Sequence, residues 1–68
     1  MKNIIKQLRK NKGLRQEDMA VSLNVSRQTI ISLETGKYNP SILLAHQIAL
    51  LFNKNIEEIF IFENFGGK

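Results

Sequence analysis

The stretch QEDMAVSLNVSRQTIISLET, residues 16–35, decides the fold because it carries the pattern of two short helices joined by a tight turn. Hydrophobic residues at helical spacing predict these helices over residues 16–23 and 27–35. Asn24 suits the turn, since Asn tolerates left-handed backbone better than any residue except Gly. Ser26 is placed to cap the second helix by accepting a hydrogen bond from a free backbone N–H.

Each helix of this unit has one buried side and one polar side. Ala20 lies where the two helices must approach closely, which requires a small side chain. The residues that we expect to point inward are Met19, Leu23, Val25, Ile30 and Leu33. The outer side of the second helix carries Arg27, Gln28, Thr29 and Ser32, where solvated helices prefer Glu and Lys. This pattern is typical of a helix-turn-helix, whose second helix is free to enter the major groove of DNA.

Three further helices are expected outside this unit, at about residues 3–12, 41–52 and 56–60. Gly13 follows the first of them as a C-terminal stop, and Ser41 is placed to cap the second. The stripe that we expect to face the core in that second helix consists of Ile42, Ala45, Ile48, Ala49 and Phe52. All three helices can therefore pack onto the inward side of the two-helix unit.

Composition excludes several kinds of site. The 68 residues suffice for one small domain, without cysteine and with His46 as the only histidine. Disulfides, thiolate sites and a structural zinc site are therefore not expected, and neither is a cofactor or small-molecule ligand. The sequence begins without a signal peptide, and its most apolar run, residues 42–52, is too short to span a bilayer. We expect a cytoplasmic protein with no membrane partner.

Charge is distributed unevenly along the chain. The formal net charge is +4. Residues 1–27 carry seven Lys and Arg against two acids, whereas residues 28–68 carry three against four. Such asymmetry favours a surface that faces a polyanion, although solubility alone explains a modest positive charge equally well.

Residues 8–41, LRKNKGLRQEDMAVSLNVSRQTIISLETGKYNPS, followed by ALLFNKNIEEIF at 49–60, resemble the Cro/repressor-type (Xre-type) helix-turn-helix proteins of bacteria and their phages. The resemblance implies an all-α, five-helix, lambda-repressor-like DNA-binding domain over residues 1–68. Two positions depart from the pattern: Asn24 stands where Gly is usual, and Arg15 stands where Thr or Ser usually caps.

The resemblance also implies roles in binding double-stranded DNA. The residues placed at base edges are Arg27, Gln28, Thr29 and Ser32. Arg can pair with guanine and Gln with adenine, and the Thr methyl can touch thymine, each good pair adding roughly 1–3 kcal/mol of discrimination. The expected phosphate contacts are Arg15, Gln16, Ser26, Lys37, Tyr38 and Asn39. For Tyr38, packing beneath its loop is the alternative.

Arg9 and Glu34 match positions that form an ion pair in the family. We expect a partly buried salt bridge between them that fixes the recognition helix against the first helix. Such a pair specifies geometry more than it stabilises the fold.

The chain has more apolar residues than a five-helix core requires. The segment FIFENF, residues 60–65, is aromatic and β-branched, which favours a strand over helix. Some very short members of the family dimerise through a small antiparallel sheet from their chain ends, and this chain looks similar, so we expect a C-terminal dimerisation segment at about residues 59–65. The expected homodimer interface consists of Leu50, Phe60, Ile61, Phe62 and Phe65. The alternative is that Phe60 and Phe62 cover the core of their own chain.

The sequence thus predicts a transcriptional regulator, most simply a repressor that binds an inverted-repeat operator as a homodimer. The alternative is an antitoxin or another partner-binding subunit of a toxin–antitoxin module, because the same fold serves there. An enzyme is not expected, since the chain lacks a nucleophile–base pair and paired carboxylates placed in a cleft.

Overall fold

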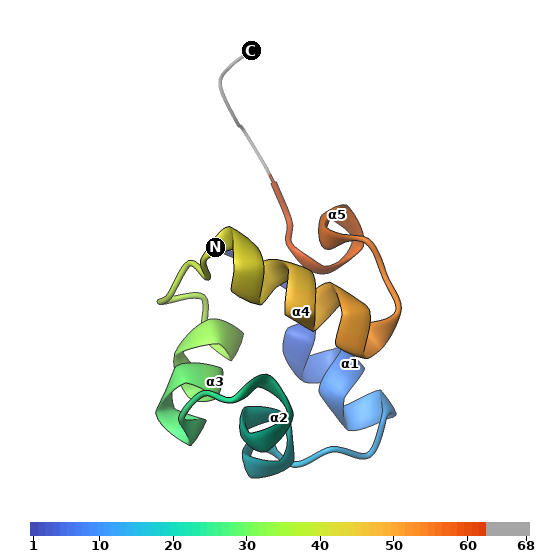
Figure 1. The fold of residues 1–68 in the computed structure, drawn as a ribbon. Coiled ribbons are helices and arrows are strands. Elements are labelled where there is room, and N and C mark those ends of the chain that lie inside the picture. Colours follow the sequence, from blue (N-terminus) through green and yellow to red (C-terminus); the bar gives the residue numbers. More distant parts are fainter. Residues whose placement is uncertain (63–68) are drawn as a thin grey trace.

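The computed structural model describes residues 1–62, and these form five α-helices. The helices are α1 (Ile5–Asn11), α2 (Gln16–Leu23), α3 (Arg27–Glu34), α4 (Ile42–Phe52) and α5 (Ile56–Ile59). Figure 1 shows α2 and α3 side by side at one end of the domain, with α4 between them and α5. The prediction of an all-α, five-helix domain is confirmed.

Local chemistry sets the helix boundaries where the sequence predicted them. The hydroxyl of Ser26 accepts a hydrogen bond from the backbone N–H of Thr29 at 3.1 Å, and the hydroxyl of Ser41 does the same for Leu44 at 3.1 Å. Both serines therefore satisfy one of the N–H groups that a helix start leaves free. Asn24 ends α2 in the left-handed region, with φ of 58°.

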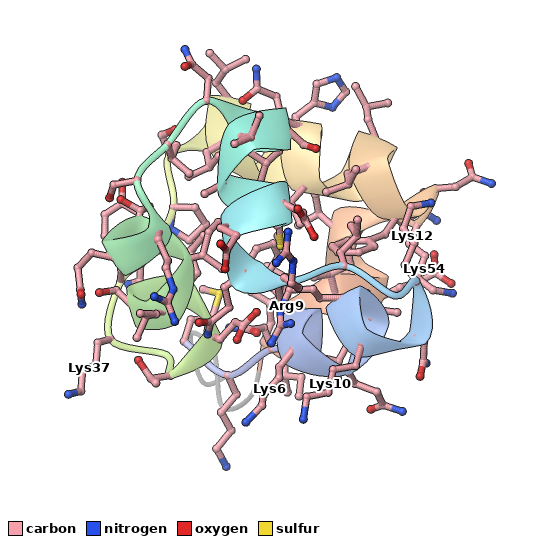
Figure 2. All side chains as sticks on the ribbon, turned by 90° about the horizontal axis from the view of Figure 1, so that it is seen from below. Lys6, Arg9, Lys10, Lys12, Lys37 and Lys54 are labelled. Atoms are coloured by element: carbon pink, nitrogen blue, oxygen red, sulfur yellow. The ribbon has the colours of Figure 1, made fainter. Side chains whose placement is uncertain are left out.

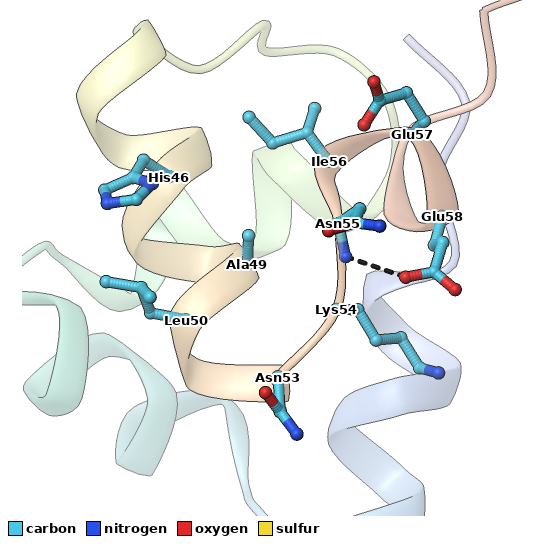
Figure 3. Close-up of a pocket in the computed structure, with 9 residues that line it drawn as sticks. All are labelled: His46, Ala49, Leu50, Asn53, Lys54, Asn55, Ile56, Glu57 and Glu58. Atoms are coloured by element: carbon cyan, nitrogen blue, oxygen red, sulfur yellow. Dashed lines mark hydrogen bonds between the residues drawn. The ribbon is translucent and has the colours of Figure 1, made fainter.

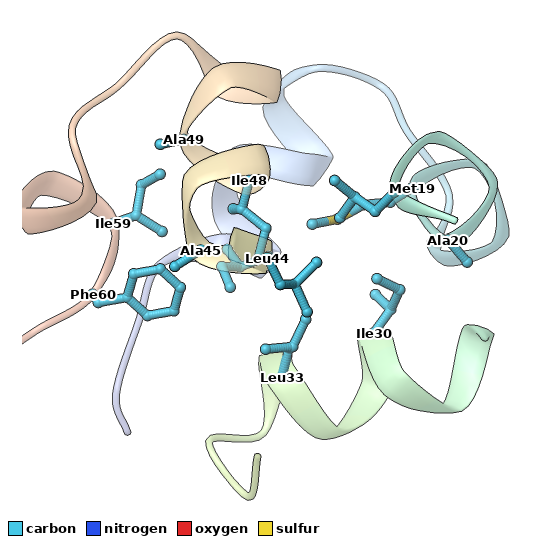
Figure 4. Packing of buried hydrophobic residues seen from close by; sticks show 12 residues of the cluster. Met19, Ala20, Ile30, Leu33, Leu44, Ala45, Ile48, Ala49, Ile59 and Phe60 are labelled. Atoms are coloured by element: carbon cyan, nitrogen blue, oxygen red, sulfur yellow. The ribbon is translucent and has the colours of Figure 1, made fainter. Parts of the chain in front are cut away.

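The core lies where α4 crosses the helix-turn-helix unit (Figure 4). Ile30 and Leu33 of α3 and Met19 of α2 meet Ile48 at the centre of α4. The buried hydrophobic residues are Ile5, Met19, Ala20, Leu23, Ile30, Leu33, Leu44, Ala45, Ile48, Ala49, Ile59 and Phe60. Each of the five helices thus contributes to one core.

The predicted inner face of α4 is wrong at one position. Ile42 is 86% exposed, whereas Leu44 is buried in its place. The difference corresponds to turning the buried face by about 40°, less than the 100° between consecutive residues of a helix. Such a small rotation could not be predicted from the sequence, because nine of the eleven residues of this helix are apolar, and only His46 and Gln47 are polar.

The two ends of the described chain lie together and pair through their backbones. Asn3 and Phe60 form an isolated antiparallel bridge, beside which the N–H of Ile4 donates to the carbonyl of Ile59 at 2.9 Å. A strand was expected at residues 60–65. Over residues 60–62, which the structure describes, it is a single β-bridge within one chain. Its remaining residues lie outside the described part.

The predicted role of Phe60 in a dimer interface is wrong. Its side chain is 2% exposed and packs in the core of its own chain, as Figure 4 shows. The bridge to Asn3 fixes the backbone of this segment, which brings the ring against α4 and α5. Leu50, Ile61 and Phe62 are exposed, and Phe65 lies outside the described residues.

Candidate nucleic-acid interface

The polar side of α3 lines a shallow hollow on the protein surface. Arg27 and Gln28 in the first turn of α3 are exposed, while Thr29 and Ser32 are half-buried. The hollow has a volume of about 280 Å³ and is lined by Gln28, Thr29, Ser32, Lys37 and Tyr38. The structure therefore brings three of the four predicted base-contact residues together with two predicted phosphate-contact residues. Arg27 is not among the lining residues.

Ser26 and Thr29 form a small hydrogen-bonded unit at the start of α3. Besides the cap, their two hydroxyl oxygens lie 2.9 Å apart. The polar atom of Thr29 thus has a partner within its own helix. Its methyl group is the part that remains for contact with a thymine methyl.

Three elements meet at a buried ion pair. The guanidinium of Arg9 in α1 donates from Nε and Nη2 to the carboxylate of Glu34 at the end of α3, and from Nη1 to the carbonyl of Leu14 at 2.9 Å. The side chains of Arg9 and Glu34 are only 9% and 4% exposed. The amide of Gln16, at the start of α2, donates to the same carboxylate at 3.2 Å. Glu34 therefore links the orientations of α1, α2 and α3.

The sequence did not reveal that Gln16 belongs to this network. It was predicted as a phosphate contact because it begins α2, and it is half-buried beside Glu34. Its amide nitrogen carries two hydrogens, and one hydrogen bond to Glu34 leaves the second. No local pattern could have indicated the contact, because the two residues are 18 positions apart.

A second carboxylate, that of Asp18, supplies one half of a capping box at the start of α2. Asp18 accepts hydrogen bonds from the backbone N–H of Arg15 at 2.9 Å and from its guanidinium at 3.2 Å. The backbone hydrogen bond, followed by the guanidinium, lowers the pKa of Asp18 below its ordinary value. The same pairing raises the pKa of Arg15. Arg15 remains exposed, so its cation lies at the helix start without being buried.

The N-terminal segment holds the loop that follows α3. The amide of Asn3 donates to the carbonyl of Leu33 at 2.8 Å, and the same carbonyl accepts from the backbone N–H of Gly36 at 3.1 Å. The amino group of Met1 donates to the carbonyl of Gly36 at 2.8 Å and to the side chain of Asn39 at 3.2 Å. Sequence reasoning missed Asn3, because an asparagine near the start of a chain gives no local signal of a distant partner.

A wider hollow of about 560 Å³ lies between α4 and α5 (Figure 3). Ala49, Leu50 and Ile56 provide apolar lining, and polar residues including His46 and Glu57 surround it. Residues 1–62 contain no group of three or more His, Cys, Asp or Glu that could hold a metal ion. Over the same part of the chain, no helix has the length and apolar character needed to cross a membrane.

Comparison with known proteins agrees with this geometry. The helix-turn-helix family matches residues 5–59. The chain is 55% identical to an uncharacterized HTH-type transcriptional regulator of Methanocaldococcus jannaschii, over 94% of this chain and 97% of the relative. A second such regulator, from Methanothermobacter thermautotrophicus, is 49% identical over the full length of both chains. The ImmF control region 10 kDa protein of Bacillus phage phi105 is 40% identical over 78% of this chain and 59% of its own.

Proposed function

Since the chain belongs to the Xre-type helix-turn-helix family, we propose that it is a sequence-specific regulator of transcription that binds double-stranded DNA through α3. The family and the lambda-repressor-like fold that the sequence predicted are confirmed. The family is one of DNA-binding, non-enzymatic proteins, which confirms that the chain is not an enzyme.

The observation that carries the proposal is the contrast between the two sides of α3. On one side, Ile30 and Leu33 pack in the core and Glu34 pairs with Arg9. On the other side, Gln28, Thr29 and Ser32 line a surface hollow. In the proposed complex Arg27 pairs with guanine and Gln28 with adenine, while Thr29 and Ser32 contact neighbouring base edges. Base readout needs a recognition helix with a fixed orientation. The contacts of its inner side supply this, because they set the direction from which the α3 side chains approach the bases.

The proposed phosphate contacts surround the base contacts. Lys37, Tyr38 and Asn39 follow α3, and their loop is held by the N-terminal segment. Arg15 and Gln16 stand at the start of α2, where free N–H groups and the helix dipole also favour phosphate. Ser26 can donate its hydroxyl to a phosphate while its oxygen caps α3. These contacts set affinity and orientation, and they carry no sequence information.

We further propose that the protein acts as a homodimer on an inverted-repeat operator and represses by occluding a promoter. One recognition helix reads only a few base pairs, so two half-sites about one turn apart give the needed specificity. Leu43 and Leu50 are exposed two helical turns apart on the outer face of α4, and Ile61 and Phe62 are exposed at the chain end. These four residues form the proposed interface, together with Phe65.

Selection of bound duplexes from a random DNA pool tests the proposed function. A salt concentration of about 0.15 M suppresses non-specific phosphate binding. We expect enrichment of an inverted repeat whose half-site centres lie one helical turn apart. If no sequence is enriched, specific recognition by this chain alone is refuted, and the toxin–antitoxin alternative takes precedence.

Light scattering tests the dimer independently of DNA. We expect the mass of a dimer at tens of micromolar, and the mass of a monomer for Leu50→Glu. Val21→Glu is the matched control, because Val21 is even more exposed than Leu50 (81% against 66%) and lies on α2 rather than on the proposed interface. A monomeric parent protein would refute the homodimer.

A further inference from the structure

Helix α1 carries a basic face that the base and phosphate contacts above do not include. Lys6 and Lys10 are both exposed, and α1 contains no acidic residue. At 100° per residue, Lys6 and Lys10 lie about 60° and 100° from Arg9, both to the same side of it. Ile5, which is buried, lies on the other side of Arg9. The two lysines therefore form a pair one helical turn apart, next to the side of α1 that reaches α3.

The position of this lysine pair is fixed relative to the recognition helix. Arg9, between the two lysines in sequence, is bound to Glu34 at the end of α3. Asn3, just before α1, donates to the carbonyl of Leu33, also in α3. Because these links join α1 and the segment before it to the last turn of α3, the place of Lys6 and Lys10 relative to α3 is fixed.

The lysine pair and Lys37, a proposed phosphate contact, lie on adjoining sides of the molecule in the view of Figure 2. Figure 2 shows Lys37 at the left of the view and Lys6 and Lys10 along its lower edge, all with side chains that extend outward. Lys12 and Lys54 lie at the right, away from Lys37. Within residues 1–62, neither Lys6 nor Lys10 forms an ion pair with a carboxylate. Their charges are thus unneutralised, in contrast to that of Arg9.

We propose that Lys6 and Lys10 form a second phosphate-contact site, which binds the DNA backbone flanking the base pairs read by α3. The proposal rests on the proposed function and extends it by adding α1 to the DNA footprint. Duplex DNA carries one negative charge per about 1.7 Å of axis, and two lysines on adjacent turns of one helix side can present two positive charges to this backbone. A flexible lysine is well adapted to this role, since it acts as a point charge without demanding bidentate geometry.

The salt dependence of DNA binding tests the proposal directly. Each phosphate neutralised by the protein contributes about 0.9 to the slope of log K against log salt. The variant Lys6→Gln/Lys10→Gln should therefore lower this slope by about 1.8. At about 0.1 M salt its affinity should fall roughly 60-fold, if the affinities converge at 1 M. The probe is a mixed-sequence duplex of about 30 base pairs, on which phosphate contacts dominate.

The matched control is Lys12→Gln/Lys54→Gln, which removes the same charge from the other side of the view in Figure 2. We expect its slope to remain within about 0.5 of the parent, and both variants to melt like the parent because all four side chains are exposed. Equal slopes for the two variants, whether both reduced or both unchanged, would overturn the proposal. If the parent itself binds no duplex at low salt, the proposed function fails as well. Binding by the parent with an unchanged slope in the test variant refutes this site alone.

Discussion

Replacing Glu34 by Ala removes the acceptor on which three donors converge. Two N–H groups of Arg9 and the amide of Gln16 lose their partner, and the Arg9 side chain, which is only 9% exposed in the parent, loses its counter-ion. Breaking a buried pair from one side in this way costs about 3–5 kcal/mol. Proteins hold about 0.05–0.15 kcal/mol of stability per residue, which gives about 3–10 kcal/mol for 68 residues. The substitution is thus expected to remove a large part of the total stability.

Thermal unfolding followed by circular dichroism measures this effect. For a domain of this size 1 kcal/mol shifts the melting temperature by about 4–8 °C, so Glu34→Ala should melt at least about 12 °C below the parent. Glu17→Ala, an exposed carboxylate on α2, is the control and should change the free energy of unfolding by less than about 0.5 kcal/mol.

The double variant Arg9→Met/Glu34→Leu separates stability from positioning. Replacing both partners by apolar residues of similar size is often neutral or stabilising, so it should melt near the parent. If the pair positions α3, this folded variant should still lose DNA affinity. A cost below about 1 kcal/mol for Glu34→Ala would mean that the pair behaves as an exposed one, and the reasoning would be refuted.

Three further predictions concern stability. The pKa of Asp18 is lowered in the folded state, so its stabilisation is present above the ordinary pKa and is lost as pH falls through the lowered value. The difference in melting temperature between the parent and Asp18→Asn should therefore shrink below about pH 4, and a constant difference would contradict this. Ile48→Ala should cost about 2–5 kcal/mol in urea unfolding, whereas Ile42→Ala should cost less than about 0.5, and equal costs would contradict the observed face of α4. Asn3→Ala removes the amide's hydrogen bonds to the carbonyls of Leu33 and Met1 and the side-chain oxygen that accepts from the N–H of Ile5, and should cost about 1–3 kcal/mol, while a melting curve like the parent's would show that these contacts are dispensable.

Helix boundaries could be predicted because they depend on local chemistry. A serine before a helical segment offers its oxygen to an N–H three residues on, as Ser26 and Ser41 do. Asn24 was recognised in the same way, since its left-handed conformation is a property of the residue itself. Such signals extend over only a few residues, so a single sequence contains them in full.

The features that could not be predicted are non-local. Phe60 is buried because its backbone pairs with Asn3, 57 positions away in sequence. The aromatic and β-branched composition of residues 60–65 suited an exposed strand equally well. Gln16 and Asn3 find partners in α3 that no spacing rule connects to them. Ile42 was misplaced because a helix with few polar residues gives little indication of which side faces inward.

The most direct test of the central claim compares duplex selections by the parent, Gln28→Ala and Lys37→Ala. Both residues line the same hollow, but one is assigned to a base edge and the other to a phosphate. We predict that Gln28→Ala loses about 1–3 kcal/mol of discrimination at one position of each half-site. Lys37→Ala should enrich the parent's sequence with uniformly weaker binding. If Gln28→Ala selected the same sequence as the parent with unchanged preference at every position, the assignment of base readout to this side of α3 would be contradicted.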